Sequence, residues 1–276
     1  MDYLKPADAV AAMIEAGTRK AALSASDLLI RGALSGAILA IATHLAITAA
    51  VQTGVPLTGA LIFPVGFVMI VLLNLELVTG SFAVLPMAQM DDGIRFADTL
   101  RNWVYGYAGN LVGSLLYAGL AWGALTMFGE TPAGAVGDRI AALADAKTLA
   151  YSAHGGAGWI TAFAKAMLCN WMVCMGVVMS VVAQSTVSKI VAAWLPICIF
   201  FGLGYEHAVV NMFVIPVGML LGAKTTIDAW WLWNQIPVTL GNLVGGFLFT
   251  GLALYSTYRT RSAKVTPVAV KAPAMP

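Results

Sequence analysis

Charged residues are scarce in this sequence. Only 10% of its 276 residues are Asp, Glu, Lys or Arg, whereas soluble domains carry roughly 25%. The charge-free windows are long: 32–75, 102–129, 166–188, 190–205, 207–223 and 229–258. Because a transmembrane helix needs about 20 mostly apolar residues, several windows are long enough to cross a bilayer. The sequence indicates an all-α, polytopic membrane protein, and the short alternating pattern of an outer-membrane barrel is absent.

Cysteine is also rare, and strong net charge is missing. Cys169, Cys174 and Cys198 lie in apolar windows without paired spacing, so we interpret them as small apolar side chains rather than disulfides or metal ligands. The net charge is +2 and no basic patch stands out, which argues against a nucleic-acid partner. The sequence predicts no cofactor and no metal site.

Six membrane spans are predicted, at 28–51, 58–90, 102–128, 159–187, 190–223 and 235–258. They make up a six-helix channel domain over 28–259 within the lipid bilayer. Residues 1–27 before it are expected to hold a cytoplasmic amphipathic helix over 6–23, and Ser24 with Asp27 has the pattern of a capping box. The proline-containing segment 260–276 is expected to be a disordered cytoplasmic tail.

The distribution of Lys and Arg predicts the orientation. With both termini in the cytoplasm, eleven of these residues lie inside and four lie outside, a clear positive-inside bias. Charged residues precede the first apolar run, which has full spanning length, so a cleavable signal peptide is not expected. We therefore expect a multi-pass protein of the inner, or plasma, membrane.

The second and fifth spans are too long for straight helices. Residues 58–90 would stretch roughly 50 Å at ~1.5 Å per residue, against a hydrocarbon core of about 30 Å, and residues 190–223 pose the same problem. Each also holds a lone carboxylate near glycine, Glu76 or Glu206. The pattern predicts two broken helices, whose loops would have to line a cavity or be buried in protein.

A repeat relates the two halves of the chain. The sequence Gly-Asn-Leu-Val-Gly at 109–113 returns at 241–245, an offset of 132. At the same or nearly the same offset stand the pairs Pro64/Pro196, Pro86/Pro216, Glu76/Glu206 and Arg31/Lys165. Small residues at helix contacts can produce such similarity through packing alone, but several matches at one offset favour duplication. Three spans per half would make the repeats inverted, as in many transport proteins.

Few ionisable residues lie at membrane depth, where they are functional candidates. His207 is the strongest, because it stands at the predicted break of the fifth span and imidazole can donate a hydrogen bond or exchange a proton near neutral pH. Thr79, at the break of the second span, is expected to face it. We interpret Glu76 and Glu206 as structural residues that accept hydrogen bonds from free backbone N–H groups of their loops.

Other candidates have simpler explanations. Phe63 and Phe67, before the first break, and Phe200 and Phe201, before the second, are expected to form constrictions that exclude hydrated ions. Lys165 is expected to extend to the outer membrane interface, and His44 to form an interhelical hydrogen bond.

Three motifs resemble the formate/nitrite transporter family, and the resemblance covers essentially the whole chain. They are Glu76-Leu77-Val78-Thr79-Gly80, Cys169-Asn170-Trp171-Met172-Val173-Cys174, and Gly204-Tyr205-Glu206-His207 with Asn211-Met212. The resemblance implies a homopentamer of aquaporin-like protomers, each conducting formate, nitrite or a similar monovalent anion, with protons. It implies that His207 is the central pore histidine and Thr79 its partner. It also implies pore-lining roles for Phe63, Phe67, Leu77, Phe200, Asn170 and Val173.

Two positions depart from the family pattern. Val78 stands where phenylalanine is usual, and counting back from Asn170 places His154 where many members carry a lysine at the outer mouth. Two alternatives to an anion channel or proton-coupled transporter stay open. One is a channel for neutral solutes such as water or glycerol, although paired Asn-Pro-Ala loops are absent. The other, a membrane-embedded enzyme, lacks an obvious nucleophile or metal cluster near His207.

Overall fold

The computed structural model describes residues 3–259, and within them the chain is helical apart from loops and an isolated bridge between Tyr3 and Ala183. The helices are α1 (Pro6–Ala21), α2 (Ala25–Thr53), α3 (Pro56–Ile62), α4 (Pro64–Leu72), α5 (Val78–Met90), α6 (Phe96–Thr126), α7 (Gly134–Ser152), α8 (Gly155–Val182), α9 (Thr186–Gly202), α10 (Ala208–Leu220), α11 (Ile227–Trp230), η1 (Trp231–Gln235), α12 (Ile236–Gly246), η2 (Phe247–Leu252) and α13 (Ala253–Tyr258). The expected tail at 260–276 lies outside the described residues.

Four helical stretches within residues 3–259 are long and apolar enough to cross a membrane. They are α2, α6, α8 and the continuous helix from Ile227 to Tyr258, which contains the π-helical segments η1 and η2. Each overlaps one predicted span. The remaining apolar helices are shorter and cover 56–72, 186–202 and 208–220.

Two five-residue loops divide the other predicted spans. Residues 73–77 separate α4 from α5, and residues 203–207 separate α9 from α10. Asn74 and Gly204 take left-handed backbone conformations, with φ of 51° and 64°. The residue after each of them donates its backbone N–H to a carbonyl five residues earlier and so ends the preceding helix. Leu75 donates to Ile70 (2.9 Å), and Tyr205 donates to Phe200 (3.1 Å). The two loops therefore use the same helix-ending geometry.

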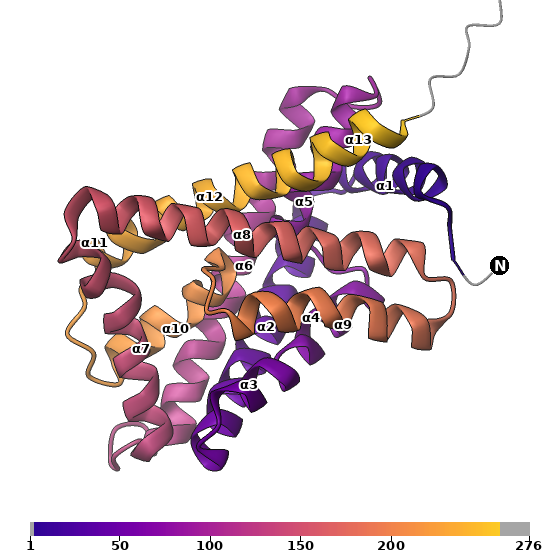
Figure 1. The fold of residues 1–276 in the computed structure, drawn as a ribbon. Coiled ribbons are helices and arrows are strands. Elements are labelled where there is room, and N and C mark those ends of the chain that lie inside the picture. Colours follow the sequence, from indigo (N-terminus) through magenta and orange to yellow (C-terminus); the bar gives the residue numbers. More distant parts are fainter. Residues whose placement is uncertain (1–2, 260–276) are drawn as a thin grey trace, which may run out of the picture.

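Two closely packed helix pairs form the scaffold. α2 packs along α6, and α8 packs along α12 (Figure 1). A methyl group at Gly113 would overlap the Ala33 carbonyl, and one at Gly245 would overlap the Met167 carbonyl. The glycines that end the repeated Gly-Asn-Leu-Val-Gly sequence thus permit the closest backbone approach in both pairs.

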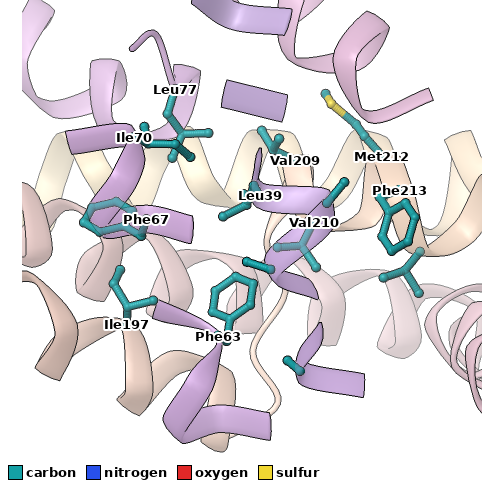
Figure 2. Close-up of a cluster of buried hydrophobic side chains, with 14 of the residues drawn as sticks. Leu39, Phe63, Phe67, Ile70, Leu77, Ile197, Val209, Val210, Met212 and Phe213 are labelled. Carbon is teal, nitrogen blue, oxygen red and sulfur yellow. The ribbon is translucent and has the colours of Figure 1, made fainter. Parts of the chain in front are cut away.

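A continuous apolar cluster surrounds the two loops. Phe63, Phe67 and Ile197 lie together beside Ile70 and Leu77, with Val209, Val210 and Leu39 next to them (Figure 2).

The amphipathic helix α1 covers a second cluster, in which its Val10 and Met13 pack with Val84 of α5 and Val178 of α8. Ser24 caps α2 by accepting the N–H of Asp27, as its sequence pattern predicts.

Candidate functional site

His207 and Thr79 meet in the interior. His207 ends the loop 203–207, Thr79 lies in the first turn of α5, and both side chains are buried. His207 Nδ1 accepts the backbone N–H of Val210 (3.2 Å), and Nε2 lies 3.1 Å from Thr79 Oγ1. Because a backbone N–H can only donate, the proton of a neutral ring is on Nε2, which donates to Thr79. The bond joins residues 128 positions apart that were predicted to face each other.

Two asparagines hold the backbone of the loops. Asn110 Oδ1 accepts the N–H of Val78 (3.0 Å), and its Nδ2 donates to the carbonyl of Glu76 (2.8 Å). In the other half, Asn242 Oδ1 accepts the N–H of Ala208 (2.9 Å), and its Nδ2 donates to the carbonyl of Glu206 (3.0 Å). These are the asparagines of the repeated sequence. They supply the loop anchoring that we had expected from the carboxylates.

The loop carboxylates bind side chains instead. Glu76 accepts a hydrogen bond from Lys20 of α1 (2.7 Å), and Glu206 accepts one from Lys147 of α7 (2.8 Å). Throughout residues 3–259 the donors to both carboxylates are side chains, so the expectation of backbone donors was wrong. The physical reason is that an uncompensated carboxylate is costly at this depth, and a lysine neutralises its charge.

Each lysine is itself held by an asparagine that sequence analysis missed. Asn102 Nδ2 donates to the main-chain carbonyl of Lys20 (3.1 Å), and Asn234 Nδ2 donates to that of Lys147 (2.8 Å). Residues 102 and 234 are also 132 positions apart, so the repeat contained the signal. We call Lys20, Glu76, Asn102 and Asn110 the first clamp, and Lys147, Glu206, Asn234 and Asn242 the second clamp.

Two cavities approach the site from different ends of the molecule. The first cavity, about 440 Å³, lies by α1, α4 and α5, and its lining includes Leu77 and three basic residues, Arg19, Lys20 and Lys189. The second, about 490 Å³, lies by α3, α7 and the end of α9, and its lining includes His207, Arg139 and Lys147. Helices α1 and α7 stand at opposite ends of the fold (Figure 1). Both cavities thus contain basic side chains within a mostly apolar lining.

Aromatic rings surround the histidine. Phe200 stacks on the His207 ring with centroids 5.7 Å apart, and Phe63 lies edge-on to Phe200 and stacked on Phe201. Of the expected constriction and pore-lining residues, Phe67 and Leu77 line the first cavity, and Phe200 and Phe201 line the second. Phe63 and Val173 are fully buried members of the apolar cluster between helices.

Asn170 acts on the backbone rather than on open space. Its Nδ2 donates to the carbonyls of Thr79 (3.0 Å) and Asn242 (2.6 Å), while its Oδ1 has no partner. It lines neither cavity in the described structure. Asn170 therefore positions Thr79 opposite His207. The neighbouring Cys174 lies 3.5 Å from the same Thr79 carbonyl, and the three cysteines are free thiols.

The outer-mouth prediction needs correction. His154 lies exposed in the turn between α7 and α8, whereas Lys147, two helical turns earlier on α7, lines the second cavity. Counting back along the chain from Asn170 overlooked this turn. Arg31 and Lys165 do stand at equivalent positions of α2 and α8, because Asn110 donates to the carbonyl of Gly32 and Asn242 donates to that of Ala166, the residue after each. The lysines that reach the loop carboxylates are a different pair, Lys20 and Lys147.

Two further side chains found partners between helices. Lys165 Nζ lies 5.7 Å from the centroid of the Tyr151 ring. His44 Nδ1 lies 3.0 Å from the hydroxyl of Tyr117 on α6, the interhelical bond that the sequence predicted. No group of three or more His, Cys, Asp or Glu side chains suited to a metal ion occurs within residues 3–259.

Known proteins share both the sequence and the fold. The "Probable formate transporter" of Methanothermobacter thermautotrophicus is 36% identical over 74% of this chain and 76% of that protein. The "Formate channel FocA" of Escherichia coli (strain K12) is 30% identical over 93% of this chain and 95% of its own length. The solved structure of an "FNT family ion channel" superposes with a TM-score of 0.78, covering 90% of this chain and 98% of that one at 26% identity.

A second solved structure, a "Pentameric formate channel with formate bound", superposes with a TM-score of 0.69 at 26% identity, over 85% of this chain and 97% of that one. The family model described as "Formate/nitrite transporter" matches residues 7–256. With nearly the whole chain matched, this protein belongs to the formate/nitrite transporter family and is a membrane channel of that family.

Proposed function

We propose that this protein conducts small monovalent anions of weak acids, formate or nitrite, through a pore that passes between Thr79 and His207. The observation that carries the proposal is their hydrogen bond, which joins the first turn of α5 to the loop 203–207. The first cavity reaches Leu77 and Gly80 beside Thr79, and the second cavity reaches His207. Lys189 in the first cavity and Arg139 in the second form no ion pair within residues 3–259, and their charges attract an anion to each opening. The formate-bound pentamer that shares this fold supports the substrate class.

An anion entering the apolar interior loses its hydration, which is prohibitive unless it is paired or neutralised. His207 offers its Nε2–H as a hydrogen-bond donor. Its Nδ1 already accepts the Val210 N–H, and a second proton there would break that bond. We infer that the ring stays neutral and donates a hydrogen bond. The proton that neutralises the substrate then enters from water with the anion.

The finer architecture follows from the same proposal. The halves containing α2–α6 and α8–α13 are taken as inverted three-span repeats, with the loops 73–77 and 203–207 meeting at mid-membrane and both termini in the cytoplasm. The matched clamps and the shared loop geometry support this arrangement. We infer a homopentamer in an inner membrane, as the pentameric neighbour suggests, with α1 and the first cavity on the cytoplasmic side.

Flux measurements test this function. Purified protein in liposomes, loaded with a pH-sensitive dye, is exposed to gradients of formate, nitrite, lactate and hydrosulfide at several pH values. We expect formate and nitrite to enter with a proton and acidify the interior faster than in protein-free liposomes. Swelling by glycerol without anion entry would favour a neutral-solute channel, and chemical turnover would favour an enzyme.

A further inference from the structure

The two clamps differ at their carboxylates. In the second clamp both oxygens of Glu206 are occupied: Oε1 accepts from the Tyr151 hydroxyl (2.8 Å), and Oε2 accepts from Lys147 and Asn211 (both 2.8 Å). In the first clamp Glu76 Oε1 accepts from Lys20, and Glu76 Oε2 is buried without a partner. The carboxylate next to His207 is therefore the one with every oxygen bonded.

The additional donors stand at positions where the first half has different residues. Tyr151 follows Lys147 by four residues, and the residue four after Lys20 is Ser24, which caps α2. Asn211 follows Glu206 by five residues, and the residue five after Glu76 is Ser81, whose hydroxyl has no partner. The difference is thus a feature of the histidine half rather than of the repeated scaffold.

The Tyr151 hydroxyl occupies the place where Glu206 would carry a proton. Oε2 already faces the ammonium of Lys147 and two amide groups, since Asn234 Nδ2 lies 3.4 Å from it as well. If Oε1 carried a proton, that proton and the hydroxyl hydrogen of Tyr151 would both lie between the two oxygens. Only one hydrogen fits there, so protonation of Oε1 would break the bond in its present direction. The bond therefore favours an ionised, fixed carboxylate.

The other titratable groups around this carboxylate do not take over that role. On α7 they are Lys147 and Tyr151, with Arg139 farther along in the second cavity. On α8, Lys165 lies over the Tyr151 ring and Cys169 is buried. His207 follows Glu206 directly but turns its two nitrogens to Val210 and Thr79. Among these groups, Tyr151 supplies the bond to Oε1.

We infer that Tyr151 is a positioning residue for anion transport, which holds Glu206 as a fixed carboxylate and keeps the adjoining pore insensitive to protonation of that glutamate. The inference rests on the proposed function. Without the hydroxyl, Glu206 takes up a proton in acid and Lys147 loses its counter-charge. The second cavity then becomes more positive in acid and binds the anion more tightly.

The test compares the KM for formate at about pH 5 and about pH 8 in liposomes containing wild type, Tyr151→Phe, or the control Tyr117→Phe. The control also removes a tyrosine hydroxyl that bonds to a neighbouring helix, but it touches neither clamp. The quantity compared is the ratio of the KM at the acidic pH to the KM at the alkaline pH. We expect this ratio to be about threefold smaller in Tyr151→Phe than in wild type, which corresponds to one modest charge interaction. The control should follow wild type.

A second background separates this effect from a structural one. In Glu206→Gln, which cannot titrate, adding Tyr151→Phe should leave the KM ratio between the two pH values unchanged. An unaltered ratio in Tyr151→Phe alone, or the same shift in the Glu206→Gln background, would overturn the inference. Absence of formate flux through wild type would instead refute the proposed function.

If Tyr151→Phe does not fold, infrared difference spectra of wild type still decide the matter. A protonated-carboxyl band that appears between about pH 8 and about pH 5 and is lost in Glu206→Gln would contradict the inference. Its absence would support a carboxylate that stays ionised.

Discussion

Replacing Asn242 by alanine tests how the histidine loop is held. The amide makes three side-chain hydrogen bonds, to the N–H of Ala208 (2.9 Å) and to the carbonyls of Glu206 (3.0 Å) and Ala166 (2.8 Å). The Ala166 carbonyl lies within α8 and keeps its backbone hydrogen bond there, so the substitution removes only its second partner. The other two groups lie at the loop and are left buried without a partner, at about 1–3 kcal/mol each.

The sum predicts a destabilisation of roughly 2–6 kcal/mol. At about 2–4 °C per kcal/mol for a chain of this size, the midpoint of thermal unfolding in detergent should fall by at least about 4 °C. Asn110→Ala removes the matching bonds of the other loop and should cost a similar amount. Asn242→Asp keeps the acceptor for Ala208 but places an oxygen against two carbonyls, so it should not rescue. A midpoint within about 1 °C of wild type in Asn242→Ala would refute the anchoring role.

Three further changes follow from the same contacts. Lys147→Met leaves the buried Glu206 without its counter-charge and should destabilise the protein by about 3–5 kcal/mol, measured by thermal unfolding; unchanged stability would mean the ion pair is dispensable. Glu206→Ala should lower the stability of the oligomer before it alters selectivity, because Lys147, Tyr151 and Asn211 lose their acceptor; a stable oligomer with a changed formate-to-nitrite flux ratio would place Glu206 in the pore. Deleting residues 6–21 uncovers the cluster around Val84 and leaves Glu76 unpaired, so flux and its pH dependence should change; flux identical to wild type would exclude a gating role for α1.

Much of the fold was predictable because membrane helices consist of long stretches of apolar residues that are visible in the sequence. Long charge-free windows place the long helices, and the lone carboxylates with their neighbouring glycines mark the two loops. The pairing of His207 with Thr79 was also predictable, since a duplicated scaffold brings equivalent loops together. The Gly-Asn-Leu-Val-Gly repeat further identified Asn110 and Asn242, although their task of anchoring the loops was assigned to the carboxylates.

The residues that escaped prediction act through tertiary contacts. Lys20 and Lys147 lie outside the charge-free windows, and they entered the prediction only as charges that set the orientation. Nothing local shows that their helices fold back onto the two loops. The sequence around Tyr151 does not distinguish it from other tyrosines on the apolar face of a helix. Its role depends on the packing of α7 beside Glu206. By contrast, Asn102 and Asn234 were detectable, because they share the offset of 132 with the repeat.

Formate entry into liposomes containing wild type or His207→Phe, at equal amounts of folded protein, tests the central claim most directly. The phenylalanine fills the same space but removes the Nε2–H donor. The account predicts rapid formate entry with internal acidification for wild type, and entry at the level of protein-free liposomes for His207→Phe. Equal flux through both proteins would show that the anion does not pass His207, and would contradict the account.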